Sequence, residues 1–215
     1  MRQKIIFLSL VFLISTGFIS LCFAEGQITI LVSGQSHASL YPCDCPKAPN
    51  GGVTRRATLI KNIKNSDKNV LLLEAGGSFA GGSYDGNSQN TDWDKKRTEF
   101  YLQSLVKMGY DAFLVSSEEF NFGKEFFNQM QSKFKLNYLS ANIKGDYAPY
   151  IIKEMGNIKV AIIGITDERV KEKTEKQYID IQQSLSKTIE EVKKIKKADL
   201  VVVLRTDLKE LRRRL

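Results

Sequence analysis

Short apolar runs alternate with amphipathic segments along this chain, and this alternation is the feature that most restricts its fold. Three of the runs each precede a polar loop, as expected of parallel strands that are buried on both faces; they are Ile28–Val32, Val70–Leu73 and Ala112–Val115. Strands are also expected at Leu136–Ser140 and, as a pair that turns at Gly156-Asn157, at Tyr150–Glu154 and Lys159–Gly164. Asp199–Leu204 is expected to be one more buried strand. The order of the elements predicts an α/β fold with a mostly parallel sheet flanked by helices.

The segments between these runs space their apolar residues at helical intervals. Helices are expected at Val53–Asn65, Trp93–Met108, Lys124–Lys133 and Tyr178–Lys197. In the first helix, the residues predicted to face the core are Ala57, Ile60 and Ile63, and those predicted to face outward are Arg55, Arg56 and Lys61. The predicted core stripe of the second helix is Phe100, Tyr101, Leu105 and Met108.

The loops after the first three strands are the places where a site is expected, because ligands of open α/β sheets bind at the carboxyl ends of the strands. The residues of these loops include Gln35 and His37, Gly77 and Ser78, and Ser117 and Glu118. The second loop continues to Asp92 and contains five glycines, so we expect it to be flexible.

Several short motifs follow one another in a fixed order through most of the chain. They are Gly51-Gly52-Val53-Thr54-Arg55, Leu71–Gly76, Gly109-Tyr110-Asp111-Ala112, Glu119–Gly123, Leu139–Ile143 and Val160–Thr166. In these motifs the chain resembles the N-terminal half of the catalytic domain of calcineurin-like metallophosphoesterases, in the 5′-nucleotidase branch. The resemblance implies a double-sheet sandwich, here shortened, and a centre at which two metal ions promote hydrolysis of phosphate esters.

The departures from the family pattern fall on the residues that carry its chemistry. The resemblance implies that Gln35 replaces a ligand aspartate and that Gly77 replaces the aspartate that bridges the two metals. It also implies that Ser117-Glu118 replaces an Asn-His pair. The former active-site cleft that the resemblance implies is lined by Gln35, His37, Gly77, Ser78, Ser117 and Glu118. His37 corresponds to a family ligand, and it is the only histidine in the chain, so the later histidine ligands have no counterpart.

These losses predict an inactive hydrolytic site. A two-metal site holds its ions about 3.5–4 Å apart and needs a shared anionic bridge with several nitrogen and oxygen donors around it. Gly77 offers no side chain, and Gln35 offers only a neutral oxygen. We therefore expect no cofactor. The alternative is a single divalent metal held by His37 and Glu118, which would support residual phosphoesterase activity with Asn121 or Asn142 orienting the phosphate.

The first 24 residues have the pattern of a cleavable signal peptide. Arg2 and Lys4 precede an apolar segment, and Cys22-Phe23-Ala24 is a small-x-small cleavage site. The sequence therefore predicts cleavage after Ala24, a periplasmic or secreted protein and no further membrane span. The resemblance implies that residues 25–215 form a single truncated metallophosphoesterase-like domain.

Cys43 and Cys45 are the cysteines that remain after such a cleavage, and in an oxidising compartment they are expected to be oxidised. A Cys-x-Cys disulfide closes a small, strained ring, and strained bridges are easily reduced. Three interpretations stay open: a structural staple in a proline-rich loop, a redox-active pair, and part of a thiolate metal site that the two thiolates alone would leave incomplete.

The net charge of +8 comes largely from lysines and arginines between 171 and 197 and between 205 and 214. The lysines of the last predicted helix form a solvated face, and export with no interleaved aromatic residues argues against nucleic acid as a partner. The leading hypothesis is an exported, catalytically inactive binding or assembly module for an unknown protein partner or small ligand. The alternatives are a residual metal-dependent phosphoesterase and a thiol-redox protein acting through Cys43 and Cys45.

Overall fold

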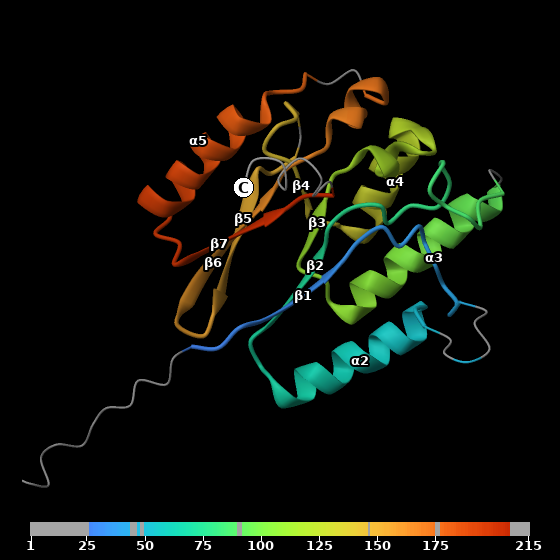
Figure 1. Cartoon of the computed structure of the whole chain (residues 1–215), viewed down its shortest axis with the longest axis horizontal. Helices are drawn as coiled ribbons and strands as arrows, with labels where there is room; N and C mark the ends of the chain where they lie inside the picture. The colour runs from blue at the N-terminus through green and yellow to red at the C-terminus, as the bar shows by residue number, and fades with distance from the viewer. Residues whose placement is uncertain are drawn as a thin grey trace, which may run out of the picture.

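The protein forms two stacked β-sheets with helices on both outer faces, as the computed structural model in Figure 1 shows. The structure describes residues 26–43, 47, 50–89, 92–145, 147–174 and 177–206. The predicted signal peptide lies outside these residues. Among the described residues, no helix has both the length and the apolarity needed to cross a bilayer.

The first sheet is parallel throughout and has the strand order β1-β2-β3-β4. Its strands are β1 Thr29–Ser33, β2 Val70–Glu74, β3 Ala112–Leu114 and β4 Tyr138–Leu139. Every residue of the inner strand β2 is buried, which explains its uninterrupted apolar sequence. The four predicted strands are confirmed, with ends that differ by one or two residues.

The second sheet has the order β5-β6-β7 and consists of β5 Tyr150–Met155, β6 Ile158–Gly164 and β7 Leu200–Leu204. The predicted hairpin is confirmed: β5 and β6 are antiparallel and pair Met155 with Ile158 across the turn. β7 runs parallel to β6. The prediction that β7 is buried is wrong, because the strand lies at the end of the sheet order and leaves Leu200 38% and Val203 39% exposed.

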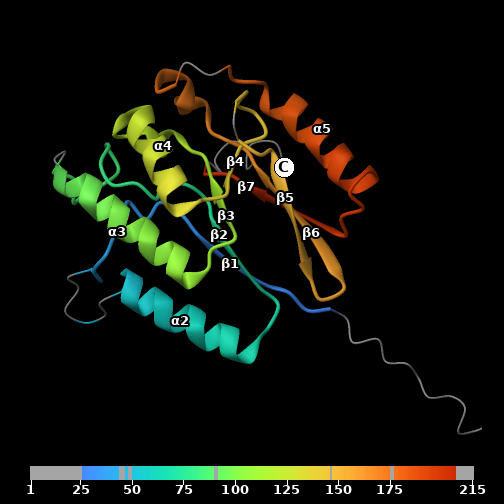
Figure 2. The ribbon, with the colours of Figure 1, turned by 180° about the vertical axis from the view of Figure 1, so that it is seen from behind.

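Helices α2, α3 and α4 cover one face of the first sheet, and α5 covers the outer face of the second, as the opposite views in Figures 1 and 2 show. Their bounds are α2 Val53–Ser66, α3 Asp92–Met108, α4 Gly123–Phe134 and α5 Ile181–Lys194. Two short 3₁₀ helices, η1 Ser117–Phe120 and η2 Glu168–Glu172, follow strands β3 and β6. The four predicted helices are thus confirmed, although α5 begins three residues later than expected.

Three apolar layers hold these elements together. Leu71, Leu73 and Ile162 are among the buried residues between the two sheets. Beneath α3 and α4 the core is aromatic, and the Phe127 ring centroid lies 4.8 Å from that of Tyr138. Because the α5 layer packs on the second sheet separately, the structure is a double-sheet sandwich flanked by helices, and the predicted fold class is confirmed.

Two side-chain orientations differ from the sequence prediction. Arg56, expected to face outward, is half-buried and donates hydrogen bonds to the Tyr101 hydroxyl and, at 3.2 Å, to Ser36 Oγ. Phe100, expected in the core, is 58% exposed, whereas Tyr101 is fully buried. Neighbouring residues point about 100° apart around a helix, so Tyr101 takes the core position and Phe100 the surface.

Part of the glycine-rich loop after β2 is packed into the structure. Phe79 and Ala80 are fully buried, and the Ala80 N–H donates to Thr98 Oγ1 at 3.0 Å. Further along, Arg97 of α3 pairs with both Asp85 and Asp94. These contacts anchor part of the loop, whereas Gly82–Tyr84 and Gly86-Asn87 are exposed. The predicted flexibility of the loop stays a prediction.

Candidate functional site

The loops after β1 and β2 are joined by backbone hydrogen bonds at the carboxyl end of the first sheet. The N–H groups of Gln35 and His37 donate to the carbonyls of Gly76 and Gly77, both at 2.8 Å. In this loop Gln35, His37 and Ala38 adopt positive φ angles of 52°, 44° and 50°. Each left-handed non-glycine residue costs about 1–2 kcal/mol, and such strain is concentrated at binding and catalytic sites.

Gly77 stands where the resemblance implies a bridging aspartate, and neighbouring residues fill the space beside it. Gly77 has a φ of 72°, and a Cβ built there would lie 2.5 Å from Glu118 Oε2 and 2.7 Å from Gln35 Nε2. It would also lie 2.9 Å from Gln35 Cα, which is backbone. The side chains of Gln35 and Glu118 therefore occupy the space into which an aspartate at residue 77 would extend.

Glu118 lies between His37 and Arg169 at the candidate site. It is 5% exposed, and neither carboxylate oxygen has a hydrogen-bond partner among the described residues. His37 Nδ1 lies 3.9 Å from Oε2, and Arg169 Nη1 lies 3.8 Å from Oε1. His37 Nδ1 is likewise buried without a hydrogen-bond partner in the described structure. The structure thus brings together three residues predicted from the sequence, namely Gln35, His37 and Glu118.

This donor set does not fit a pair of divalent ions. Within the described ranges, no group of three or more His, Cys, Asp or Glu side chains is arranged to hold a metal. His37 and Glu118 are two strong ligands, whereas protein sites for transition metals usually supply three or four. The carboxylate that a two-metal centre shares between its ions has no place at Gly77.

Ser78 and Ser117, also predicted to line the cleft, are engaged in the surrounding structure. Ser78 is fully buried and donates from Oγ to Glu119 Oε1 at 2.9 Å. The N–H of Ser117 donates to Asp167 Oδ2 at 3.0 Å. A small pocket of about 240 Å³ opens beside them, and its lining includes Ser117, Glu118, Arg169 and Lys173.

Two fully buried carboxyl groups beneath the cleft were missed by the sequence reasoning. Burial raises the pKa of Glu74 to about 7, against the opposing effect of a 2.5 Å hydrogen bond from Ser33 Oγ. Burial likewise raises the pKa of Glu119 to about 7, although Ser116 and Ser78 donate to it. The spacing of Ser116 and Glu119 is that of a capping box, and this signal could have identified Glu119 as an anchored residue.

The side chains of Asn121 and Asn142, the two predicted phosphate ligands, form hydrogen bonds within the protein. Asn142 is buried and pairs through both side-chain atoms with the backbone of Thr166, at 2.8 and 2.9 Å. Asn121 donates to the carbonyl of Gly81 at 2.9 Å and accepts from Lys173 Nζ at 2.7 Å. Neither amide is available to orient a phosphate in this arrangement.

Of the two predicted cysteines, the structure describes only Cys43. Cys43 is exposed, and its N–H donates to the Asn50 carbonyl at 2.8 Å. Cys45 lies outside the described residues, so the disulfide, redox and metal interpretations of this pair stay predictions.

Comparisons with known proteins agree with the fold. No protein-family profile matches the chain. It is 32% identical to a snake venom 5′-nucleotidase of Naja atra over 157 residues, which cover 65% of this chain and 28% of that protein. It is 29% identical to a 5′-nucleotidase of Vibrio cholerae over 193 residues, which cover 83% of this chain and 33% of that protein.

The solved structure of a 5′-nucleotidase precursor from Thermus thermophilus matches with a TM-score of 0.68 at 26% identity, over 83% of this chain and 36% of that one. The chain spans about a third or less of the length of the curated relatives named above. Sequence and structure together show that the chain belongs, at modest identity and over most of its length, to the 5′-nucleotidase branch of the calcineurin-like phosphoesterase family.

Proposed function

We propose that this chain is an exported, catalytically inactive member of the family that serves as a binding or assembly module. The observation that carries the proposal is the environment of Gly77. Glu118 Oε2 and Gln35 Nε2 fill the space of a side chain at this residue, so the shared carboxylate of a two-metal centre is missing and its place is taken. Export is supported by the signal-peptide pattern of residues 1–24.

The cleft contains polar groups that could bind a ligand, but it lacks the metal ligands that a hydrolase of this family needs. Glu118 is a buried carboxylate with unsatisfied oxygens, and leaving such groups unpaired is costly. A water molecule, or a ligand that donates hydrogen bonds, would satisfy these oxygens. Arg169, whose side chain is 45% exposed, places a positive charge at the same carboxylate. The cleft can therefore bind a small polar group even though it lacks the donors for phosphate hydrolysis.

A phosphate-release assay with AMP or p-nitrophenyl phosphate and Mn²⁺, Co²⁺ or Zn²⁺ tests this proposal. We expect no release above that of a His37→Ala variant, because two strong ligands do not position paired ions. Elemental analysis of the purified protein after metal loading and dialysis is expected to find far less than one ion per chain. Metal-dependent turnover that is lost in His37→Ala would refute the inactive assignment.

The second candidate function is a residual phosphoesterase with a single metal. It is favoured by one observation: His37 Nδ1 and both Glu118 oxygens are buried and lack hydrogen-bond partners among the described residues, and Nδ1 lies 3.9 Å from Oε2. Stoichiometric metal in the same analysis, lost equally in His37→Ala and Glu118→Gln, would establish this alternative if it came with turnover. Metal without turnover would retain the inactive assignment and make the cleft a metal-binding module.

A further inference from the structure

One strand of the first sheet projects beyond the second sheet. Thr206, directly after β7, lies against Gly76, close to the end of β2: a Cβ built at Gly76 would be 2.7 Å from Thr206 Cγ2. At the end of β6, Gly164 lies against Leu139 of β4, and β6 also contacts β3. β7 is therefore stacked over β2, which leaves β1 beyond the last strand of the second sheet.

The projecting β1 and the open edge of β7 form a step along this side of the sandwich. Ile30 of β1 and Val202 of β7 both pack in the layer between the sheets. Alternate side chains of a strand share a face, so Val32 and Leu200 are directed toward the same layer. Val32 is nevertheless 57% exposed and Leu200 38% exposed. The apolar layer between the sheets is thus open to solvent along the step.

Both strands of the step also direct backbone groups outward. In β1, the Thr29 N–H and the Ser33 carbonyl form hydrogen bonds on the side of β2. In β7, the Leu204 carbonyl accepts a hydrogen bond at 2.9 Å from the segment after β6. Backbone groups of alternate residues point to opposite sides of a strand, so those of Ile30 and Val203 point to the open edges. In the part of the chain that the structure describes, no further strand pairs with either edge.

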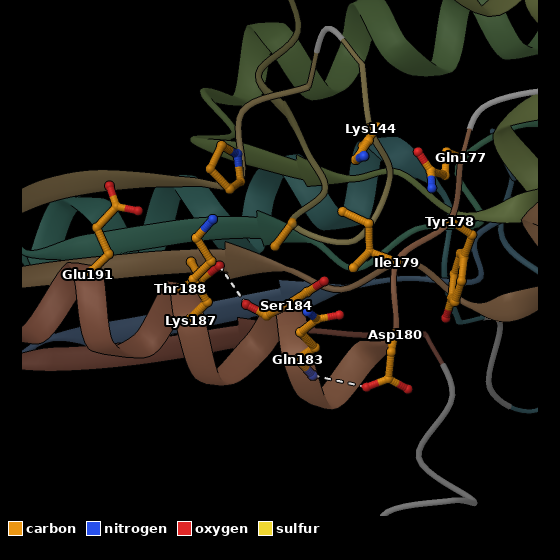
Figure 3. Close-up of a pocket in the computed structure, with 12 residues that line it drawn as sticks. Lys144, Gln177, Tyr178, Ile179, Asp180, Gln183, Ser184, Lys187, Thr188 and Glu191 are labelled. Atoms are coloured by element: carbon orange, nitrogen blue, oxygen red, sulfur yellow. Dashed lines mark hydrogen bonds between the residues drawn. The ribbon is translucent and has the colours of Figure 1, made fainter.

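Helix α5 does not cover the step, because it is tied to the opposite edge of the second sheet. Glu191 of α5 accepts a hydrogen bond from the Tyr150 hydroxyl of β5 at 2.6 Å. Figure 3 shows Glu191 and Thr188 on the side of the helix that faces the loop of Lys144. At the β7 edge, Val203 remains 39% exposed. The helix therefore covers the outer face of the sheet and leaves β7 accessible to another strand.

The sequences of the two strands do not protect them from association. Exposed edge strands usually carry a charged residue or a proline that prevents pairing, and neither β1 nor β7 contains one. The polar residues beside β1, Gln27 and Gln35, are uncharged, whereas Lys197 and Arg205 lie beside β7. β7 can therefore pair with β1 of another copy without bringing like charges together.

We propose that a second copy of this chain fills the step. β1 of each copy pairs with β7 of the other, so the same contact is made twice about a two-fold axis that runs along the strands. β1 and β7 run in the same direction (Figure 1), so the paired strands are parallel. The four-stranded sheet of each copy is then continued by the three-stranded sheet of the other. Pairing of β7 with β7 would instead force both projecting β1 strands into the same space.

The dimer gives a partner to the assembly role proposed above. It concerns the strand edges and not the cleft, so it holds whether or not the cleft is inactive. The phosphate-release assay and the association measurements below can therefore fail independently.

Sedimentation equilibrium of the purified protein tests the proposal, and we expect a species with twice the mass of one chain. Val32→Lys places a charge in the step and is expected to raise the dimer dissociation constant at least about tenfold. Leu59→Lys is the matched control, because Leu59 of α2 is 58% exposed and lies outside the step. It is expected to change the dissociation constant less than about twofold. A protein that stays monomeric, or equal losses in the two variants, would overturn the proposal.

A second pair of variants tests the backbone contact. Val203→Pro removes the outward N–H of β7, a change that an edge strand tolerates, and is expected to weaken association at least about tenfold. Val203→Ala retains the N–H and is expected to weaken it less than about threefold. Circular dichroism of both variants confirms that the single chain remains folded. Dimers that persist in both Val32→Lys and Val203→Pro would use another surface and would refute the pairing of β1 with β7.

Discussion

Replacing Gly77 with aspartate is expected to destabilise the protein by about 3 kcal/mol or more and to leave phosphate release at background. The new Cβ would lie 2.5 Å from Glu118 Oε2 and 2.9 Å from Gln35 Cα, so both neighbours have to move. The residue would hold a φ of 72° that an L side chain rarely adopts. Its carboxylate would also be placed beside the buried carboxylate of Glu118. Urea unfolding followed by circular dichroism measures the loss.

Gly86→Asp is the matched control, because a Cβ at Gly86 meets nothing within 4 Å. This variant adds the same charge at a residue of the same loop and is expected to change the stability by less than about 0.5 kcal/mol. If Gly77→Asp were as stable as Gly86→Asp and took up two manganese ions per chain, the cleft would be able to open into a two-metal centre. The inactive assignment would then rest on a single replaced residue.

The second large effect concerns Glu74 and its dependence on pH. Its folded-state pKa of about 7 lies above the ordinary value of 4.5, so the folded protein retains a proton that the unfolded chain releases between these values. The stabilising effect of that proton is complete below pH 4.5 and is lost as the pH rises through 7. For a shift of this size the loss at pH 8 is about 3 kcal/mol. Glu74→Gln removes the ionisable group and is expected to recover most of the stability that the wild type loses at pH 8.

Urea unfolding of the wild type and of Glu74→Gln at pH 5 and pH 8 measures this difference. The variant is expected to be more stable than the wild type at pH 8 and nearly equal to it at pH 5. The glutamine oxygen can still accept the hydrogen bond from Ser33. Glu154→Gln, which removes an exposed carboxylate of β5, serves as the control for the loss of one carboxylate. A stability gain that is the same at both pH values would mean that Glu74 is ionised in the folded protein throughout.

Local pattern was sufficient to predict the elements of the fold. The continuous apolar sequence of β2 identifies it as a buried strand, and the helical spacing of α5 identifies it as a helix. In both cases the residues of the element itself are sufficient for the prediction. The exposure of β7 was not predictable in this way, because it depends on the position of the strand in the sheet order. The packing of the glycine-rich loop was also missed, since it depends on partners such as Arg97 and Glu119 that lie elsewhere in the sequence.

The candidate site was predictable in its members but not in its geometry. Gln35, His37 and Glu118 could be named because the resemblance places them at ligand positions of the family, in loops after strands whose ends meet at one edge of the sheet. The sequence shows that Gly77 lacks a side chain, but it does not show that two other side chains fill the gap. The raised pKa values of Glu74 and Glu119 were missed because both depend on burial, which only the assembled layers produce.

The positive φ angles at Gln35, His37 and Ala38 bear on the role of the loop after β1. Glycine adopts this conformation at no steric penalty, so a loop needed only to redirect the chain would be more stable with glycine at these positions. The protein instead holds an amide and an imidazole there, beside Gly77 and Glu118. Under the proposed binding function, the strain at Gln35 and His37 is the cost of placing these two polar groups beside Glu118, whereas Ala38 is buried in the core.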